Sequence, residues 1–165
     1  MSVILNKIDG KTVCGKVVTN FGRFLGADEY LVVNKEIRED DQQMAMMELS
    51  IPGGCEFDVV SPETYAKICK DNDYFGNKTI VVFRYLSDVV KAVEAGATVK
   101  KLNCCGIYAS EDPNATVYNK NLVLGAEDVK ELRKLADHGV ELVFQPTVQE
   151  TEVAYPQLFN TKKTW

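Results

Sequence analysis

A cysteine near the N-terminus lies in a setting suited to chemistry with anions. Cys14 follows the apolar residues 3–5 and a short polar loop that contains Lys11, and Gly15 and Lys16 come directly after it. From Gly15 onward the pattern is that of an amphipathic helix. Backbone N–H groups at a helix start attract anions, and nearby lysines favour the thiolate form of a cysteine. The stretch therefore predicts a reactive thiol or an anion site where a strand turns into a helix.

Three interpretations of Cys14 stay open. A thiolate is a good nucleophile, and the N–H groups of residues 15–17 would stabilise the charge of a phosphoryl group on it. Cys14 would then be a phosphoryl carrier. It is alternatively an inert small residue in a site that has lost its activity. The third interpretation is a redox or covalent sensor in which Cys14 acts with Cys104 or Cys105.

Other polar residues complete the expected site. Asp9 is expected to organise its loop by accepting backbone N–H bonds, with a role as general base as the alternative. Arg84 either binds phosphate or forms a surface ion pair. The turn from Asn103 to Gly106 is expected to line the same pocket as the two lysines. The single histidine, His138, ends a predicted helix, where the helix dipole favours a cation, so it is not expected to be the acceptor.

The composition is that of one globular domain. The chain has 165 residues, of which 45% are hydrophobic and 26% charged, and its net charge is −5. No basic block suggests nucleic acid or an anionic membrane as a partner, and no apolar run is long enough for direct membrane insertion. Residues 1–10 lack the apolar core of a signal peptide, so we expect a cytoplasmic protein. Five cysteines without zinc spacing suit reduced thiols, and neither a metal nor a cofactor is expected.

Apolar runs alternate with helical patterns from end to end, which predicts an α/β fold: an open, mostly parallel sheet with helices on both faces. Residues 1–165 read as a single domain, with a peripheral C-terminal tail from about residue 154. The expected strands cover residues 3–8, 29–34, 55–60, 78–83, 99–105, 121–125 and 140–145, and the expected helices cover 16–26, 40–49, 61–70, 87–96 and 125–139.

Ligands of such sheets bind outside the carboxyl ends of the strands. Three loops follow predicted strands and carry the candidate residues, namely 9–15, 84–87 and 103–108. Right-handed crossovers bring the carboxyl ends of parallel strands to one rim. We therefore expect these loops to form the walls of one site.

The order of these segments resembles the IIB component of the mannose/fructose/sorbose class of the bacterial phosphoenolpyruvate-dependent sugar phosphotransferase system. The resemblance runs from about residue 3 to 149. Its best parts are KIDGKTVCGKVV, EYLVVNKEIREDDQQ, VFRYLSDVVKAVEAGATVKKLNCCG and ELRKLADHGVELVFQ. The opening motif of that family reads approximately R-[IV]-D-D-R-L-[IL]-H-G-Q-V, and Cys14 stands at its phosphoryl-accepting histidine. Ile8, Asp9, Gly15 and Val17 match the motif, while lysines replace its two arginines.

The resemblance implies a cytoplasmic phosphocarrier. It would take a phosphoryl group from a IIA domain and pass it to a sugar bound by IIC/IID permease subunits, with Asp9 holding the acceptor in place. Because a cysteine replaces the histidine, a second hypothesis is a IIB-like regulatory protein that binds these partners without transferring phosphate. The third hypothesis is the thiol sensor.

Overall fold

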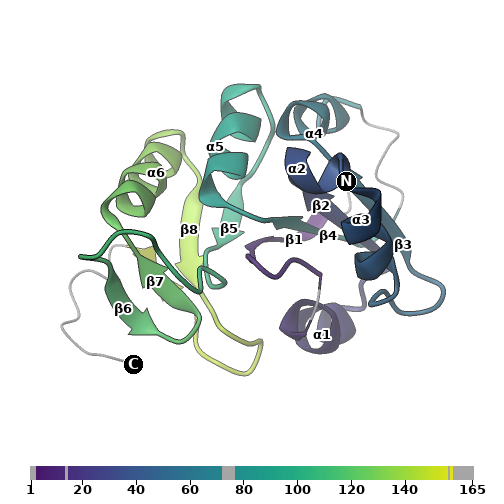
Figure 1. The fold of residues 1–165 in the computed structure, drawn as a ribbon, viewed down its shortest axis with the longest axis horizontal. Helices are drawn as coiled ribbons and strands as arrows, with labels where there is room; N and C mark the ends of the chain where they lie inside the picture. Colours follow the sequence, from purple (N-terminus) through teal and green to yellow (C-terminus); the bar gives the residue numbers. More distant parts are fainter. Residues whose placement is uncertain (1–2, 14, 72–76, 156, 158–165) are drawn as a thin grey trace.

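The centre of the molecule is a twisted sheet in which all strands but one are parallel (Figure 1). The computed structural model describes residues 3–13, 15–71, 77–155 and 157. Within these ranges the sheet has seven strands, which confirms the predicted open α/β architecture. In spatial order they are β3 (Glu56–Val60), β2 (Glu29–Val33), β4 (Thr79–Phe83), β1 (Val3–Ile8), β5 (Lys101–Asn103), β8 (Glu141–Phe144) and β9 (Val153–Ala154).

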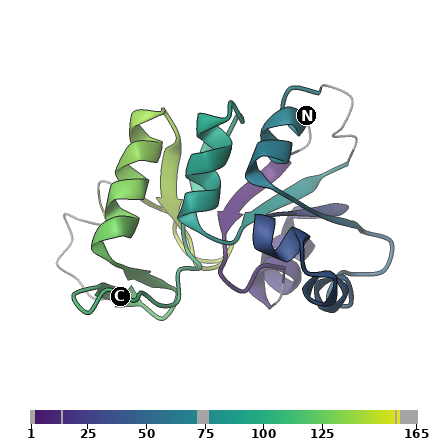
Figure 2. The same cartoon turned by 45° about the horizontal axis from the view of Figure 1, so that its top comes forward.

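Helices cover both faces of the sheet. On one face α4, α5 and α6 stand side by side (Figure 2), and on the other lie η1, α1 and α3. Strand residues alternate between the two faces, so that Leu31 packs with the first set and Val32 with the second. The bounds are η1 (Val17–Gly22), α1 (Arg23–Leu25), α2 (Lys35–Arg38), α3 (Asp41–Glu48), α4 (Pro62–Ile68), α5 (Leu86–Glu94) and α6 (Ala126–Asp137).

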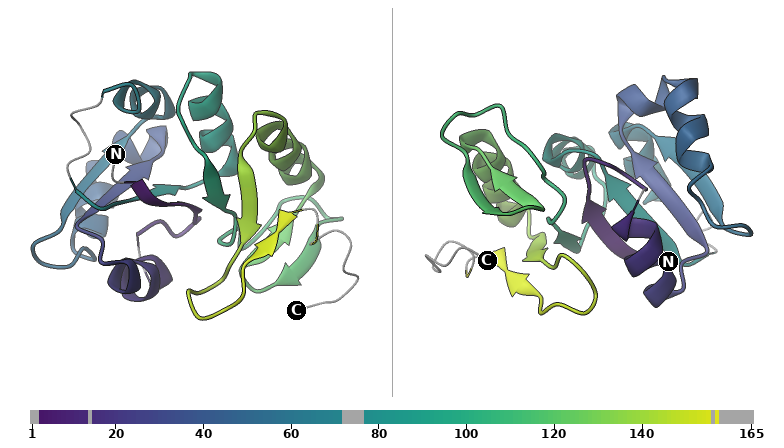
Figure 3. Two further views of the ribbon diagram at one scale, coloured as in Figure 1. Left: turned by 180° about the vertical axis from the view of Figure 1, so that it is seen from behind. Right: turned by 60° about the horizontal axis from the view of Figure 1, so that its bottom comes forward.

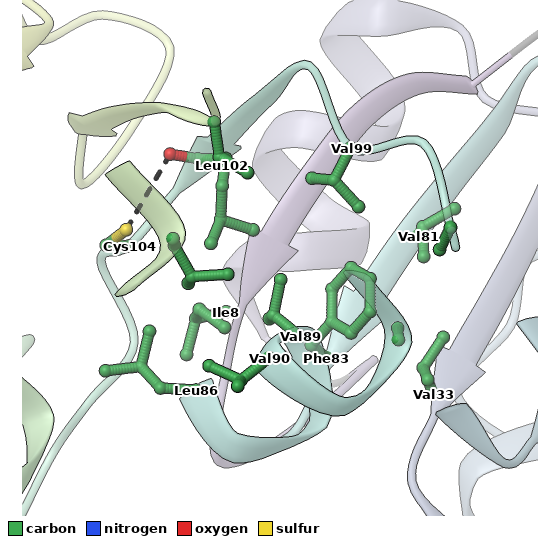
Figure 4. Packing of buried hydrophobic residues seen from close by; sticks show 14 of the residues in the cluster. Ile8, Val33, Val81, Phe83, Leu86, Val89, Val90, Val99, Leu102 and Cys104 are labelled. Carbon is green, nitrogen blue, oxygen red and sulfur yellow. Dashed lines mark hydrogen bonds between the residues drawn. The ribbon is translucent and has the colours of Figure 1, made fainter. Parts of the chain in front are cut away.

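The larger apolar core lies between the sheet and the helices α4, α5 and α6 (Figure 4). Phe83 at the end of β4 is fully buried there and meets the ring of Tyr65 edge to face, with centroids 5.5 Å apart. Leu86 and Val89 of α5 pack on the same side. This packing fixes the ends of β1 and β4 next to each other, and the site begins at those ends.

The chain leaves neighbouring strands in opposite directions at the middle of the sheet. β1 lies between β4 and β5, and residues after β1 run to η1 on one face. Residues after β4 run to α5 on the other face, and those after β5 lead to α6 there. Such a divergence opens a crevice at the carboxyl edge, because the connecting segments separate there.

Two segments differ from the sequence-based expectation. The helix expected over 16–26 consists of η1, a π-helical segment, followed by the short α1. Close approach requires Gly22 here, because a Cβ at this position would lie 1.9 Å from the Tyr30 hydroxyl. The apolar run 121–125 lies outside the main sheet, where β7 (Leu122–Leu124) pairs antiparallel with β6 (Thr116–Asn119).

The last described strand, β9, closes one edge of the sheet. It pairs antiparallel with β8, beside which it lies in Figure 3. Tyr155 stacks on Phe144, with ring centroids 6.5 Å apart. The chain thus stays docked on the sheet through residue 155, and most of the expected tail, residues 156 and 158–165, lies outside the described residues.

Candidate functional site

The loop after β1 is tied to the end of β4 and to the loop after β5. The N–H of Asp9 donates to the carbonyl of Phe83 (2.9 Å), and the N–H of Gly10 donates to the carbonyl of Gly106 (2.9 Å). The Asp9 carboxylate accepts a hydrogen bond from the N–H of Lys11 at 2.9 Å. The backbone carbonyl of Asp9 accepts one from the N–H of Thr12. Described parts of the three predicted rim loops therefore lie together, and Asp9 has the turn-forming bonds expected of it.

A buried pair of opposite charges, Lys7 and Asp9, lies at the base of this loop. Asp9 and Lys7 are each 2% exposed, and the Lys7 ammonium lies 3.7 Å from the Asp9 carboxylate. The ammonium also donates to the carbonyls of Ile8 and Cys105. Burial lowers the pKa of Lys7 and raises that of Asp9, while the attraction between the two charges opposes both shifts.

Tyr108 connects the loop after β5 to the same carboxylate. Its hydroxyl donates to Asp9 and lies 3.1 Å from each carboxylate oxygen. Its ring lies 4.5 Å from the Lys11 ammonium, a cation–π contact. The carboxylate of Asp9 thus accepts hydrogen bonds from two donors and pairs with Lys7, which favours a loop-organising role over general-base catalysis.

A cavity of about 520 Å³ opens where these loops meet. Its lining residues come from the loops after β1, β4 and β5 and from α5 and α6: Gly10, Lys11, Arg84, Tyr85, Leu86, Ser87, Ile107, Tyr108, Ala109, Asp128 and Glu131. Arg84 also lies 3.9 Å from the carboxylate of Glu36 and 5.0 Å from the Tyr85 ring. It is therefore both a cavity residue and the partner of a surface carboxylate, so the two expectations for it are compatible.

Asn103 and Gly106, which were expected to line the same pocket as Lys11, are not among the residues that line its cavity. The Asn103 amide donates to the Gln145 carbonyl (2.8 Å), and its oxygen accepts the N–H groups of Cys105 and Gln145 (3.2 Å each). The Gly106 N–H donates to Asn121. These hydrogen bonds join β5 to β8 and join the loops to one another.

Lys16 and Gly15 lie apart from the cavity lined by Lys11. Lys16 lines a different hollow, which is bordered by Lys120 and the 146–150 segment. Gly15 has a φ of 55°, and its carbonyl accepts two bonds from Thr19. Cys14 lies outside the described residues. The single pocket expected for Lys11 and Lys16 is thus two separate hollows.

The two vicinal cysteines do not have the properties of a thiol sensor. Cys104 and Cys105 are 0% and 1% exposed. Burial raises the pKa of Cys104 far above the ordinary value and that of Cys105 to about 11. Both remain protonated at neutral pH, and a protonated thiol is a poor nucleophile.

His138 lies at the far end of α6, as expected. It is exposed, and its Nδ1 lies 2.8 Å from the Lys134 carbonyl. The cavity is lined by Asp128 in the first turn of the same helix. Ten residues separate the two along the helix, which corresponds to about 15 Å.

Sequence reasoning missed four contributors to this site. Lys7 is buried in a β-strand, and no sequence pattern distinguishes such a lysine from an exposed one. Asp128 and Glu131 look like the ordinary acidic first turns of a helix, yet they line the cavity. Tyr108 lay within an expected rim loop, but its bond to Asp9 depends on how two distant loops pack.

Two further properties concern the described part of the chain. None of its helices has the length and apolar character needed to cross a membrane. Within the same ranges, no group of three or more His, Cys, Asp or Glu side chains could hold a metal ion.

Known proteins resemble this chain in sequence and in fold. The fructose-specific EIIB component of Bacillus subtilis is 24% identical over 160 residues, which are 97% of each chain. The mannose-specific EIIAB component of Escherichia coli is 23% identical over 142 residues, 86% of this chain and 43% of that protein. The IIBSor domain of the Klebsiella pneumoniae sorbose permease superposes with a TM-score of 0.85 at 22% identity, covering 99% of both chains.

A protein-family model matches this chain as well. The model of the PTS system sorbose subfamily IIB component matches residues 3–165, nearly the whole chain. The relatives of known structure have the same fold as this chain. The chain therefore belongs to the sorbose subfamily of IIB components of the sugar phosphotransferase system.

Proposed function

We propose that this protein is a cytoplasmic, single-domain IIB phosphocarrier with Cys14 as its phosphoryl acceptor. It takes the phosphoryl group from a IIA domain and passes it to a sugar bound by the IIC/IID subunits of a membrane permease. The observation that carries the proposal is the meeting of Lys11 and Arg84 in one cavity. Lys11 stands three residues before Cys14 in the sequence, on the loop that leads to the family's acceptor position.

The chemistry requires a nucleophile and charge neutralisation. The Cys14 thiolate attacks phosphorus, an S–P bond forms, and the bond to the donor atom breaks with its electron pair staying on the donor. In the second transfer a sugar hydroxyl attacks phosphorus, loses its proton and releases the thiolate. Lys11 and Arg84 stabilise the oxygens of the transferring group, because cations in a partly desolvated cavity interact strongly with them.

Relatives support the partners in this proposal. The Escherichia coli relative is named as an EIIAB component, so A and B components are joined in that protein. The Klebsiella pneumoniae relative is described as a domain of a sorbose permease. We infer that this chain likewise meets a IIA donor on one side and a permease on the other.

Intact-mass analysis tests the acceptor. With the cognate IIA domain, its upstream phosphocarrier and phosphoenolpyruvate, the wild type is expected to gain one phosphate that iodine removes. Cys14→Ser should abolish the adduct, and the matched control Cys69→Ser should keep it, because Cys69 lies at the end of α4. Lys11→Ala should slow labelling by about 10-fold or more.

The same experiment separates the two hypotheses. If the wild type takes no label while Cys14→His does, the site has lost its acceptor, and the protein binds its partners without transfer. A label on His138 would contradict the proposal, because that residue lies at the other end of α6 from the cavity.

A further inference from the structure

The cavity at the carboxyl edge carries charges of both signs, which is more than phosphoryl transfer requires. Lys11 and Arg84 come from the loops after β1 and β4. Asp128 and Glu131 come from the first two turns of α6 and line the same cavity. A site built only for a phosphoryl group would gain nothing from these carboxylates, since they repel the anion.

The acidic side chains differ in how much of their hydrogen-bonding capacity is already used. Asp128 accepts the N–H of Gly125 at 2.8 Å and so caps α6. Glu131 is half-buried, one turn further along. Ser87 of α5 adds a hydroxyl to the lining, and Tyr85 and Tyr108 add aromatic rings. The lining therefore offers cations, groups that can hydrogen-bond to sugar hydroxyls, and aromatic ring faces within one cavity.

We propose that this cavity binds a monosaccharide phosphate, with the phosphate on Lys11 and Arg84 and the sugar hydroxyls on Glu131 and Ser87. The inference rests on the proposed function for the class of ligand, because phosphorylated sugar is the product of such a system. Arginine binds phosphate through two parallel N–H bonds, and carboxylates accept hydrogen bonds from hydroxyl groups. A volume of about 520 Å³ lies within the range of about 300–1,000 Å³ that small-molecule sites have.

Such a site would let the product regulate the carrier. A bound sugar phosphate occupies the two cations that the incoming phosphoryl group needs. Phosphorylation of Cys14 should then slow as the sugar phosphate accumulates, and unphosphorylated sugar should have no such effect.

Titration calorimetry on the full chain tests the binding directly. The ligands are the phosphate esters of fructose, mannose, sorbose and N-acetylgalactosamine, with inorganic phosphate and the unphosphorylated sugars as comparisons. At least one ester is expected to bind about tenfold more tightly than inorganic phosphate or its parent sugar, since one hydrogen bond to a charged group is worth about that factor. If inorganic phosphate binds as tightly as every ester, the cavity is an anion site only, and the proposal is wrong. If no ester binds, the cavity is not a sugar phosphate site, which also overturns the proposal.

Variants separate recognition of the sugar from recognition of phosphate. Glu131→Gln should weaken ester binding about five- to tenfold, yet leave inorganic phosphate binding unchanged or tighter, because a negative charge is removed. Glu127→Gln is the matched control on the same helix, since its side chain is 76% exposed and pairs with Lys130. Arg84→Gln should weaken the binding of both the ester and inorganic phosphate.

A second variant and a second readout keep the test independent of folding and of transfer. Ser87→Ala should weaken the ester alone, so it replaces Glu131→Gln if that variant does not fold. Cys14→Ser should leave ester binding unchanged even though it abolishes labelling. Ester binding without phosphorylation of the wild type would therefore refute the proposed function and support this inference. Phosphorylation of the wild type without ester binding would support the proposed function and refute this inference.

Discussion

The hydroxyl of Tyr108 lies 3.1 Å from each oxygen of the Asp9 carboxylate. Ninety-nine positions separate the two residues in the chain, and this contact joins the loop after β5 to the loop after β1. The Tyr108 ring also lies beneath the ammonium of Lys11. One side chain thus holds both the carboxylate that shapes the loop and the cation that faces the cavity.

Two substitutions of Tyr108 should separate these contacts. Tyr108→Phe removes the bond to a carboxylate, which should lower the free energy of unfolding by about 1–3 kcal/mol. Tyr108→Leu also removes the ring beneath Lys11 and should cost about 0.5–1 kcal/mol more. Urea denaturation measures both, and the labelling rate should fall further for leucine than for phenylalanine. A Phe variant as stable as wild type would show that the Asp9 contact contributes nothing.

Close approach of two backbones should make Gly106 the least replaceable glycine at the site. It has a φ of 135°, and a Cβ there would lie 2.3 Å from the Ile8 carbonyl and 2.8 Å from the Asp9 Cα. Gly106→Ala should therefore lower the free energy of unfolding by about 3 kcal/mol or more.

Gly139→Ala is the control for the effect of backbone conformation alone. Its φ is 82°, but a Cβ there meets nothing within 4 Å, so the cost should be about 1 kcal/mol. Urea denaturation compares the two variants. Equal losses would mean that the loops around Gly106 shift apart at little cost.

The thiols should differ sharply in reactivity. Cys104 and Cys105 are buried with raised pKa values, so iodoacetamide at neutral pH should leave them unmodified in the folded protein. Cys55 and Cys69 are half-buried and should react faster. Peptide mass mapping before and after denaturation measures this. Rapid modification of Cys104 or Cys105 in the native protein would restore the thiol-sensor hypothesis.

Stability should depend on pH through Glu131. Burial raises its pKa above the ordinary value of 4.5, and the charges of Asp128, Glu127 and Asp88 add to the shift while Lys134 opposes it. The folded protein thus binds this proton more tightly than the unfolded chain does. The resulting contribution to the free energy of unfolding falls as pH rises from about 4.5 through the raised pKa, and it is constant above.

Glu131→Gln removes that contribution. Relative to wild type the variant should gain stability as pH rises through this window, and the difference should then level off. Urea unfolding at a series of pH values measures it, with Glu141→Gln, whose side chain is 64% exposed, as the control. A difference that shrinks with rising pH would contradict the raised pKa.

The sequence predicted the sheet well because the strands β2 and β4 near its middle are buried on both faces. Continuous apolar runs such as residues 79–83 are visible without knowledge of the fold, and glycines mark the helix ends that separate them. The π-helical form of η1 was not predictable, since a pattern of buried residues does not distinguish hydrogen bonds to the fourth and the fifth residue. The short strand β6 was missed, and with it the antiparallel pairing of β7.

The candidate site was predictable as a place and less so as a set of contacts. The topology of a parallel sheet brings loops 9–15, 84–87 and 103–108 to one edge, whatever their side chains. Which polar groups remain able to contact a ligand depends on hydrogen bonds between loops that are distant in sequence. The side chain of Asn103, for instance, forms hydrogen bonds with the backbone of Gln145, and no local sequence pattern indicates these bonds.

The central position of β1 has a consequence for how the chain acquires its fold. Its neighbours in the sheet are β4 and β5, which are synthesised only after β2, β3 and their helices. Because β1 is synthesised before both of these neighbours, it must wait without its native partners until residues 79–103 have emerged. Pairings between segments so distant in sequence form slowly, and unpaired apolar strands are prone to aggregate. The N-terminal strand, which carries the chain into its site loop, is thus the segment most exposed to misfolding during synthesis.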